Sequence, residues 1–290
     1  MRISTTTDYL AERADDHTAL ECLAQIGFDA VDFSLYRYLA DDKMFSDGSY
    51  KTFFEAVYQT AEQNQIAIEQ VHSVYPTYTF NKEQDAKLFD LLIKSLEITS
   101  VLHSRFLVIH PPIPAKCRYD YGREEARRLA VDFYKRLEPY AQKYGVKIAL
   151  ENMFNYDPIK KKICPTICST AEEMACIIDE LGQDSFVACL DIGHANLTGD
   201  TPEHMIKVLQ NRLQLLHVHD NDGISDLHTA PFSGKINWEK VCGALKGTGY
   251  SGAFSFEADC FFDSYPKAMM PDCAAFLYKI GRYLADTYFL

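Results

Sequence analysis

Short apolar or β-branched runs alternate with longer runs of helical periodicity eight times along the chain. This alternation predicts parallel strands joined by right-handed crossovers, and eight such units close into a barrel. We therefore predict an α/β protein with a single (β/α)₈ barrel domain over residues 1–290. The expected strands are RISTTT from Arg2, AVDFSLY from Ala30, IAIEQVHS from Ile66, RFLVIHP from Arg105, VKIALENM from Val146, FVACLDIGHAN from Phe186, LQLLHVHD from Leu213 and GAFSFEAD from Gly252.

Signals at the ends of several predicted helices support this interpretation. A helical run from Tyr121 ends on Gly145, the residue type most often found just after a helix. Ser169 and Glu172 form a capping-box pattern, and Pro202 occupies a first-turn position of the next helix. An open doubly wound sheet is the alternative, but no G-x-G-x-x-G or P-loop sequence follows any predicted strand.

The acidic balance of the chain restricts its partners. A formal net charge of −12 argues against nucleic acid or an anionic membrane as the main partner. The N-terminus has no apolar segment after its Arg, and no run of about 18 apolar residues occurs, so we expect neither a signal peptide nor a membrane-spanning helix. Nine scattered cysteines are expected to be reduced thiols. These features predict a cytoplasmic protein, with homo-oligomers left open.

Four successive predicted strands end on residues that bind metals. Active sites of (β/α)₈ barrels lie at the C-terminal ends of the strands, so polar residues there are interpreted as a set. The fifth strand ends on Glu151 and the sixth on Asp191. The seventh runs through His217 to His219, and the eighth ends on Glu257. We assign one divalent metal ion to Glu151, Asp191, His219 and Glu257.

Side-chain alternation predicts that these groups point into the barrel. Glu151 shares a face with Ala149, and Glu257 shares one with Ser255, while their apolar neighbours face the helices. A buried carboxylate costs several kcal/mol unless it is paired or bound to a metal. Two Glu, one Asp and one His suit Mn²⁺, Mg²⁺, Co²⁺ or Zn²⁺ and leave coordination positions for substrate oxygens.

Further polar residues at the strand ends are candidates for binding substrate. They follow the third, fourth, fifth and sixth predicted strands, so they would surround the metal ligands at the mouth of the barrel. This set comprises His72, His110, Asn152, His194 and Asn196. In the loop after the seventh strand, Asp226 and His228 are candidate ligands of a second metal ion.

Six motifs lie at predicted strand ends or in the loops that follow them. They are HPP at His110, LEN at Leu150, LDIGHAN at Leu190, HVHDND at His217, DLHTAPFSGKINW at Asp226 and SFEAD at Ser255. Together they resemble the xylose-isomerase-like TIM-barrel superfamily of sugar-phosphate isomerases and epimerases, from the third strand to the end of the chain. The resemblance implies a metal-dependent enzyme that isomerises or epimerises a small sugar.

The resemblance also implies roles for individual residues. Glu151, Asp191, His219 and Glu257 match the family's four metal ligands, and His194 matches a substrate-contacting histidine. The two glutamates match the catalytic acid/base pair of the ketose epimerases. Those epimerases carry an Arg a few residues beyond the metal-binding His, and the stretch DNDGIS that follows His219 contains none. The resemblance therefore does not single out a ketose 3-epimerase.

These roles predict proton transfer in an open-chain sugar. The metal is expected to bind two neighbouring oxygens and to acidify the C–H group between them, which gives an enediolate. Glu151 and Glu257 would lie on opposite faces of that carbon, where one removes the proton and the other returns it. Return to the same carbon inverts it, whereas delivery to the neighbouring carbon interconverts aldose and ketose.

Other functions remain open at this stage. The superfamily includes the type IV apurinic (AP) endonucleases, metal-dependent phosphodiesterases with three zinc ions. Nine residues are similar to their ligand positions: His72, His110, Glu151, Asp191, His194, His219, Asp226, His228 and Glu257. Against this alternative, the chain is acidic, and His194 lies in DIGH rather than in a D-T-C-H type segment. A polyol dehydratase or lyase and a catalytically inactive sugar-binding barrel are the remaining alternatives.

Overall fold

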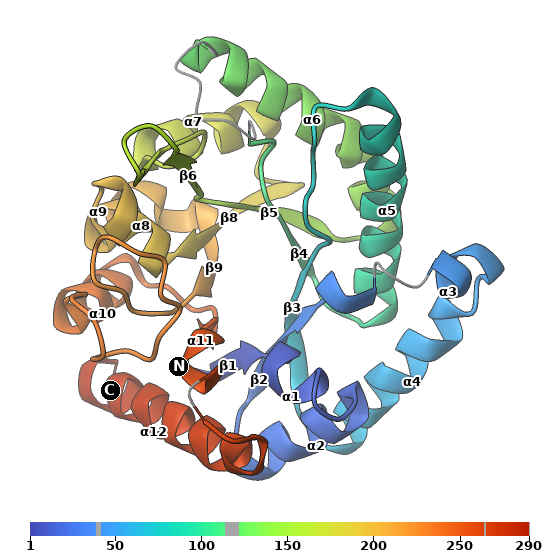
Figure 1. Cartoon of the computed structure of the whole chain (residues 1–290), viewed down its shortest axis with the longest axis vertical. Helices are drawn as coiled ribbons and strands as arrows, with labels where there is room; N and C mark the ends of the chain where they lie inside the picture. The colour runs from blue at the N-terminus through green and yellow to red at the C-terminus, as the bar shows by residue number, and fades with distance from the viewer. Residues whose placement is uncertain (39–41, 114–121, 264, 290) are drawn as a thin grey trace.

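Eight parallel strands stand at the centre of the computed structural model, which describes residues 1–38, 42–113, 122–263 and 265–289 (Figure 1). In sheet order they begin with β10 (Phe254–Phe256), which pairs with β1 (Ile3–Thr6). The sheet continues through β2 (Ala30–Ser34), β3 (Ala67–His72), β4 (Phe106–Ile109), β5 (Lys147–Glu151), β8 (Phe186–Asp191) and β9 (Leu213–His217).

The sheet closes on itself between β9 and β10. Val218, the residue after β9, forms a parallel bridge with Phe256 of β10. Val218 N donates to Ser255 O at 2.8 Å, and Glu257 N donates to Val218 O at 3.1 Å. The predicted (β/α)₈ TIM barrel is therefore confirmed.

The main helices form a ring around the strands (Figure 1). They are α2 (Asp16–Ile26), α4 (Tyr50–Gln63), α5 (Lys82–Val101), α6 (Arg123–Tyr144), α7 (Ala171–Leu181), α9 (Pro202–Leu209), α10 (Trp238–Thr248) and α12 (Met270–Tyr288). Helix α12 packs beside α2, which joins the two ends of the chain in the ring. Shorter helices lie in the loops, namely α1 (Asp8–Ala11), α3 (Asp42–Asp47), α8 (Ile192–Thr198) and α11 (Cys260–Asp263). Among the described residues, no helix is both long and apolar enough to cross a bilayer.

Side-chain alternation divides the apolar residues into two cores. In β5, Ile148 and Leu150 join the large core between sheet and helices, whereas Ala149 faces the barrel axis. The small axial core consists of Phe106, Val108, Ala149, Val187, Cys189 and Leu215. Because alternate residues of a strand share a face, Glu151 continues the row of Ala149 toward the mouth of the barrel.

All eight observed strands are shorter than the predicted runs, and the differences in β8 and β9 affect the site. The run FVACLDIGHAN is a strand only to Asp191, because the Asp191 side chain accepts a hydrogen bond from His194 N at 2.6 Å and caps helix α8. The run LQLLHVHD is a strand only to His217. A small antiparallel hairpin, β6 (Phe154–Asp157) with β7 (Lys162–Pro165), was not predicted.

The predicted helix ends are mostly confirmed. Helix α6 ends at Gly145, whose φ of 68° is left-handed, and Pro202 begins α9. Tyr121, where the first of these runs was expected to begin, lies outside the described residues. The capping box at Ser169 was wrong, because its hydroxyl donates to Met153 O and accepts from Thr166 N, both at 2.6 Å.

Candidate metal centre

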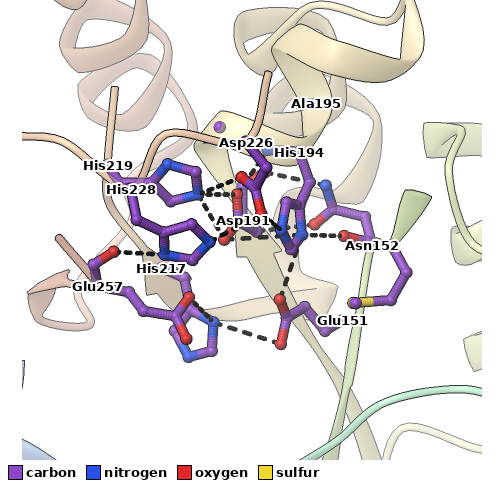
Figure 2. A network of polar contacts seen from close by, with 12 residues as sticks. Glu151, Asn152, Asp191, His194, Ala195, His217, His219, Asp226, His228 and Glu257 are labelled. Carbon is purple, nitrogen blue, oxygen red and sulfur yellow. Dashed lines mark hydrogen bonds and ion pairs between the residues drawn. The ribbon is translucent and has the colours of Figure 1, made fainter. Parts of the chain in front are cut away.

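Four buried side chains at the ends of adjacent strands converge at the mouth of the barrel, and we call them the inner group. They are Glu151 of β5, Asp191 of β8, His217 of β9 and Glu257, the residue after β10. Each offers one ligand atom, and these atoms all lie within 4.8 Å of one another. Glu151 is 1% exposed, and Asp191 and His217 are fully buried. Figure 2 shows them around a common centre.

The strand register places these side chains together. Asp191 pairs with His217 across the β8–β9 ladder, so both point inward at the same level of the barrel. Glu151 pairs with Cys189, two residues before Asp191, on the β5–β8 ladder. The inner group therefore depends on register that is fixed over three consecutive strands.

The inner group has buried polar atoms that protein contacts do not satisfy. Within the described residues, Oε2 of Glu151, Oε2 of Glu257 and both ring nitrogens of His217 make no hydrogen bond. His217 Nδ1 nevertheless lies 3.1 Å from Glu257 Oε2 and 3.3 Å from Glu151 Oε2. Unsatisfied buried groups are costly, and three carboxylates and an imidazole form a ligand set for a divalent cation. The residues therefore fit the metal that the sequence predicts.

Both glutamates are held as anions by positive neighbours. Burial raises the pKa of Glu151, but the positive charge of His217 and the close approach of the His110 imidazole outweigh it, so that the pKa lies well below its usual range. Burial likewise opposes ionisation of Glu257, and the positive charge of His217, whose Nδ1 lies 3.1 Å from Glu257 Oε2, lowers its pKa below the usual value. The site thus favours a cation beside these carboxylates, whether a histidinium or a metal ion.

His219 lies in a second cluster, which we call the outer group: His194, His219, Asp226 and His228. His219 Nε2 is 3.0 Å from Asp191 Oδ1, and in Figure 2 it lies on the opposite side of Asp191 from Glu151. Its ring stacks on His228 with centroids 3.9 Å apart. His228 Nε2 lies 3.0 Å from Asp226 Oδ2 and its Nδ1 lies 2.9 Å from Glu257 O. Burial lowers the pKa of His228, but Asp226 more than offsets this and raises it to about 10.

A buried carboxylate organises the loop that carries Asp226 and His228. Asp220 accepts hydrogen bonds from Phe232 N at 3.0 Å, Ile236 N at 3.2 Å and Trp238 Nε1 at 2.9 Å. Within this loop, position 234 must be glycine, because a Cβ there would clash with Asp220 Oδ1 and Asn221 O. The outer group is therefore positioned by a folded loop rather than by the sheet.

Close packing also fixes His219. A Cβ on Gly193, at the start of α8, would clash with the His219 ring. Only glycine lets the α8 backbone approach this imidazole so closely.

His72 and His110 lie on the other side of Glu151. His72 ends β3 and His110 follows β4, and their Nε2 atoms are 3.1 Å apart. His110 Nε2 is 3.1 Å and His72 Nε2 is 3.5 Å from Glu151 Oε2. These three residues form a further group able to hold a metal ion.

The remaining predicted substrate-binding residues have partners of their own. Asn152 donates from Nδ2 to Asp191 O at 2.9 Å and accepts at Oδ1 from Asp191 N at 2.7 Å, so its amide joins β5 to β8. Asn196 donates to Asn221 Oδ1 at 2.8 Å. His194 connects both groups, with Nδ1 at 3.4 Å from Glu151 Oε1 and Nε2 at 3.7 Å from Asp226 Oδ2.

His217 was not among the metal ligands predicted from the sequence. His217 and His219 differ by two positions, so alternation places both on the inward face. The choice between them depends on where the β8–β9 ladder ends, and that pairing is long-range. The inward polar residues Asp32 of β2 and Gln70 of β3 were also not singled out, although each occupies an inward position of a predicted strand.

Comparison with known sequences identifies a family. A sequence model of the family described as xylose isomerase-like TIM barrel matches residues 20–279. An uncharacterised protein of Methanocaldococcus jannaschii, MJ1311, is 31% identical over 158 residues, which are 54% of this chain and 51% of the relative. An inosose isomerase of Halalkalibacterium halodurans is 25% identical over 187 residues, 61% of this chain and 62% of the relative. The matched part of the chain thus spans about half to three fifths of the length of these relatives.

Solved structures share the whole fold. A D-tagatose 3-epimerase-like protein has 21% identity and a TM-score of 0.77, with 99% of this chain and 97% of that chain covered. The IOLI protein, solved with a zinc atom, has 18% identity and a TM-score of 0.78, with 99% of each chain covered. At these identities the likeness shows the fold.

Proposed function

The chain belongs to the xylose isomerase-like TIM-barrel family, and we propose that it is a divalent-metal-dependent isomerase or epimerase of a small sugar. The ion would be held by the inner group, with His217 rather than His219 as the imidazole ligand. This choice rests on the convergence of Glu151, Asp191, His217 and Glu257 within 4.8 Å. His219 would not bind the ion itself, but its Nε2, 3.0 Å from Asp191 Oδ1, would orient the Asp191 carboxylate that does.

The pair of buried glutamates carries this proposal. Glu151 and Glu257 face the same space from strands that are separated by β8 and β9 in the sheet. Each has one oxygen, Oε2, without a hydrogen-bond partner in the described chain. Inversion of a carbon centre by proton transfer needs a group on each face of that carbon, one to remove the proton and one to return it, whereas a sugar-binding protein does not need two opposed carboxylates.

The chemistry assigned to this chain is proton transfer at carbon. A bound divalent ion would polarise neighbouring substrate oxygens and so acidify the C–H group between them. With His217 bound to the ion as a neutral imidazole, the divalent cation would be the positive neighbour that keeps Glu151 and Glu257 ionised near neutral pH. One glutamate would remove the proton and later release it to water, and the other would take up a proton from water and return it from the opposite side.

The test is a substrate screen followed by isotope exchange. Ketoses, aldoses, inososes and inositols are incubated with the protein and Mn²⁺ or Zn²⁺, the inososes being included because one relative is an inosose isomerase. On the substrate found, Glu151→Gln and Glu257→Gln should each lose on the order of 10² to 10⁴ in rate. In D₂O, at least one variant should lose turnover yet still exchange a proton on one face.

A matched control is Glu239→Gln, which changes an exposed glutamate of α10 and should leave the rate unchanged. Full activity in both Glu151→Gln and Glu257→Gln would contradict the proposal, because the glutamates would then be structural.

A second candidate function is phosphodiester hydrolysis with several metal ions. Two further groups of metal-binding residue types favour it, namely His72–His110–Glu151 and the outer group, which flank the inner group on both sides. Multi-metal sites stabilise both the attacking and the leaving oxygen of a phosphoryl group.

Metal stoichiometry and DNA cleavage distinguish the two functions. We expect one tightly held ion per chain and no cleavage of abasic duplex DNA. Because the net charge is −12, any DNA binding should be weak and strongly salt-sensitive. Three ions per chain together with cleavage of abasic DNA at physiological salt would favour the hydrolase instead.

A further inference from the structure

Asp32 is a buried carboxylate of the barrel wall that the proposed proton transfer does not use. It lies in β2 and is fully buried. Gln70 Nε2, on the neighbouring strand β3, donates to Asp32 Oδ2 at 2.7 Å. Across the barrel, the same oxygen lies 3.0 Å from Nε2 of His217. A carboxylate buried this deeply is destabilising unless a positive or hydrogen-bonding partner meets it, and His217 is that partner.

The two ring nitrogens of His217 therefore face different carboxylates. Nδ1 faces Glu257 and Glu151 of the inner group, at 3.1 and 3.3 Å from their Oε2 atoms. Nε2 faces Asp32, although the N–H is not aligned as in a full hydrogen bond. A histidine nitrogen that binds a metal carries no proton, and the other N–H then needs an acceptor that fixes the tautomer and the ring orientation.

We propose that Asp32, held in place by Gln70, is a positioning residue that keeps the proton of His217 on Nε2 and presents Nδ1 to the divalent ion. The proposal rests on the metal centre proposed above. With Asp32 beside Nε2, His217 has the carboxylate partner that a metal-binding histidine usually has on its second nitrogen. The Nε2 contacts of His219, in contrast, are to Asp191 and to Asp226 of the outer group.

The experiment measures Zn²⁺ affinity by competition with a chelator, which does not depend on catalysis. Asp32→Asn should weaken binding about 10- to 100-fold, the loss typical of removing an outer partner of a ligand. Gln70→Leu should weaken it less, because Asp32 remains. Ser4→Ala is the matched control, since Ser4 is a fully buried polar residue of β1 whose hydroxyl accepts from Ser255 at 3.2 Å, and it should bind within about twofold of the natural chain.

Unchanged Zn²⁺ affinity in a folded Asp32→Asn variant would overturn the proposal. A measurement on the unsubstituted protein covers the case in which this variant fails to fold. In ¹⁵N NMR spectra of the Zn²⁺-loaded chain, we expect the His217 proton on Nε2, and a proton on Nδ1 would overturn the proposal. If the unsubstituted chain binds no Zn²⁺, the metal centre itself fails, and this result is separate from an effect of Asp32.

Discussion

The inner and outer groups contain similar residue types but are built in different ways. All four inner side chains stand at or one residue beyond the ends of β-strands, where the ladders of β5, β8, β9 and β10 fix their positions. The outer side chains come from α8 and from the loop after β9, which depends on the hydrogen bonds of Asp220. The sheet thus supplies one site and a folded loop supplies the other.

The two groups also differ in how their charges are met. In the inner group, the unsatisfied atoms include a carboxylate oxygen from each glutamate and both nitrogens of His217. In the outer group, both nitrogens of His228 have partners, Asp226 and Glu257 O, while Asp226 Oδ1 and His219 Nδ1 are buried without a hydrogen bond among the described residues. The inner group has three carboxylates and one imidazole, whereas the outer group has one carboxylate and three imidazoles, so the inner group has the larger negative charge for a divalent ion to neutralise. This comparison leads us to place the ion in the inner group.

The largest expected effect separates the two histidines of HVHDND. His217→Ala removes a proposed ligand, so it should weaken Zn²⁺ binding by more than the 10- to 100-fold typical of losing an outer partner. His219→Ala removes a partner of Asp191 and should stay within that range. Chelator competition on both variants measures the difference. A larger loss in His219→Ala would reverse the assignment of ligand and support.

A smaller effect is expected from a substitution at Gly193, which contributes to the outer group only through its close packing against His219. Gly193→Ala should lower the free energy of unfolding by about 1 to 3 kcal/mol, because the new Cβ clashes with the His219 ring. Gly243→Ala in α10 is the control, since its Cβ would meet no atom within 4 Å and alanine is the better helix former. Chemical unfolding checks both variants, and equal stability of the two would show that His219 is not tightly packed.

The smallest effect tests the charge pairing of His228 in chelator-treated protein. Its pKa is raised from 6.5 to about 10, so its contribution to stability is full below pH 6.5 and is lost as the pH rises through 10. The stability of the natural chain relative to His228→Asn should therefore fall across this window, by on the order of 1 kcal/mol. A difference that does not change between pH 6 and pH 10 would mean that His228 and Asp226 are not an ion pair.

Three of the four residues of the inner group could be predicted from the sequence, because the signal for each lies within its own strand. Glu151, Asp191 and Glu257 each follow an apolar run with strand periodicity, so the end of the run identifies the position. His217 and His219 share one face of the same run, and what ends that strand is long-range. Val218 bridges Phe256, and Asp220 pairs with Thr229.

The eightfold alternation predicted the barrel for the same local reason, since each strand and helix carries its own periodicity. The parts that were not predicted depend on tertiary hydrogen bonds. Helix α8 begins because the Asp191 side chain caps it, and Ser169 does not cap α7 because its hydroxyl bonds Met153 O and Thr166 N. Such competition between partners is invisible in a linear pattern.

The central claim is that one divalent ion binds the inner group, and anomalous diffraction tests it most directly. A crystal of the natural chain grown with Zn²⁺ is measured above and below the zinc absorption edge. We predict one strong anomalous peak among Glu151, Asp191, His217 and Glu257. A peak confined to the outer group, or no peak within reach of these four side chains, would contradict the account.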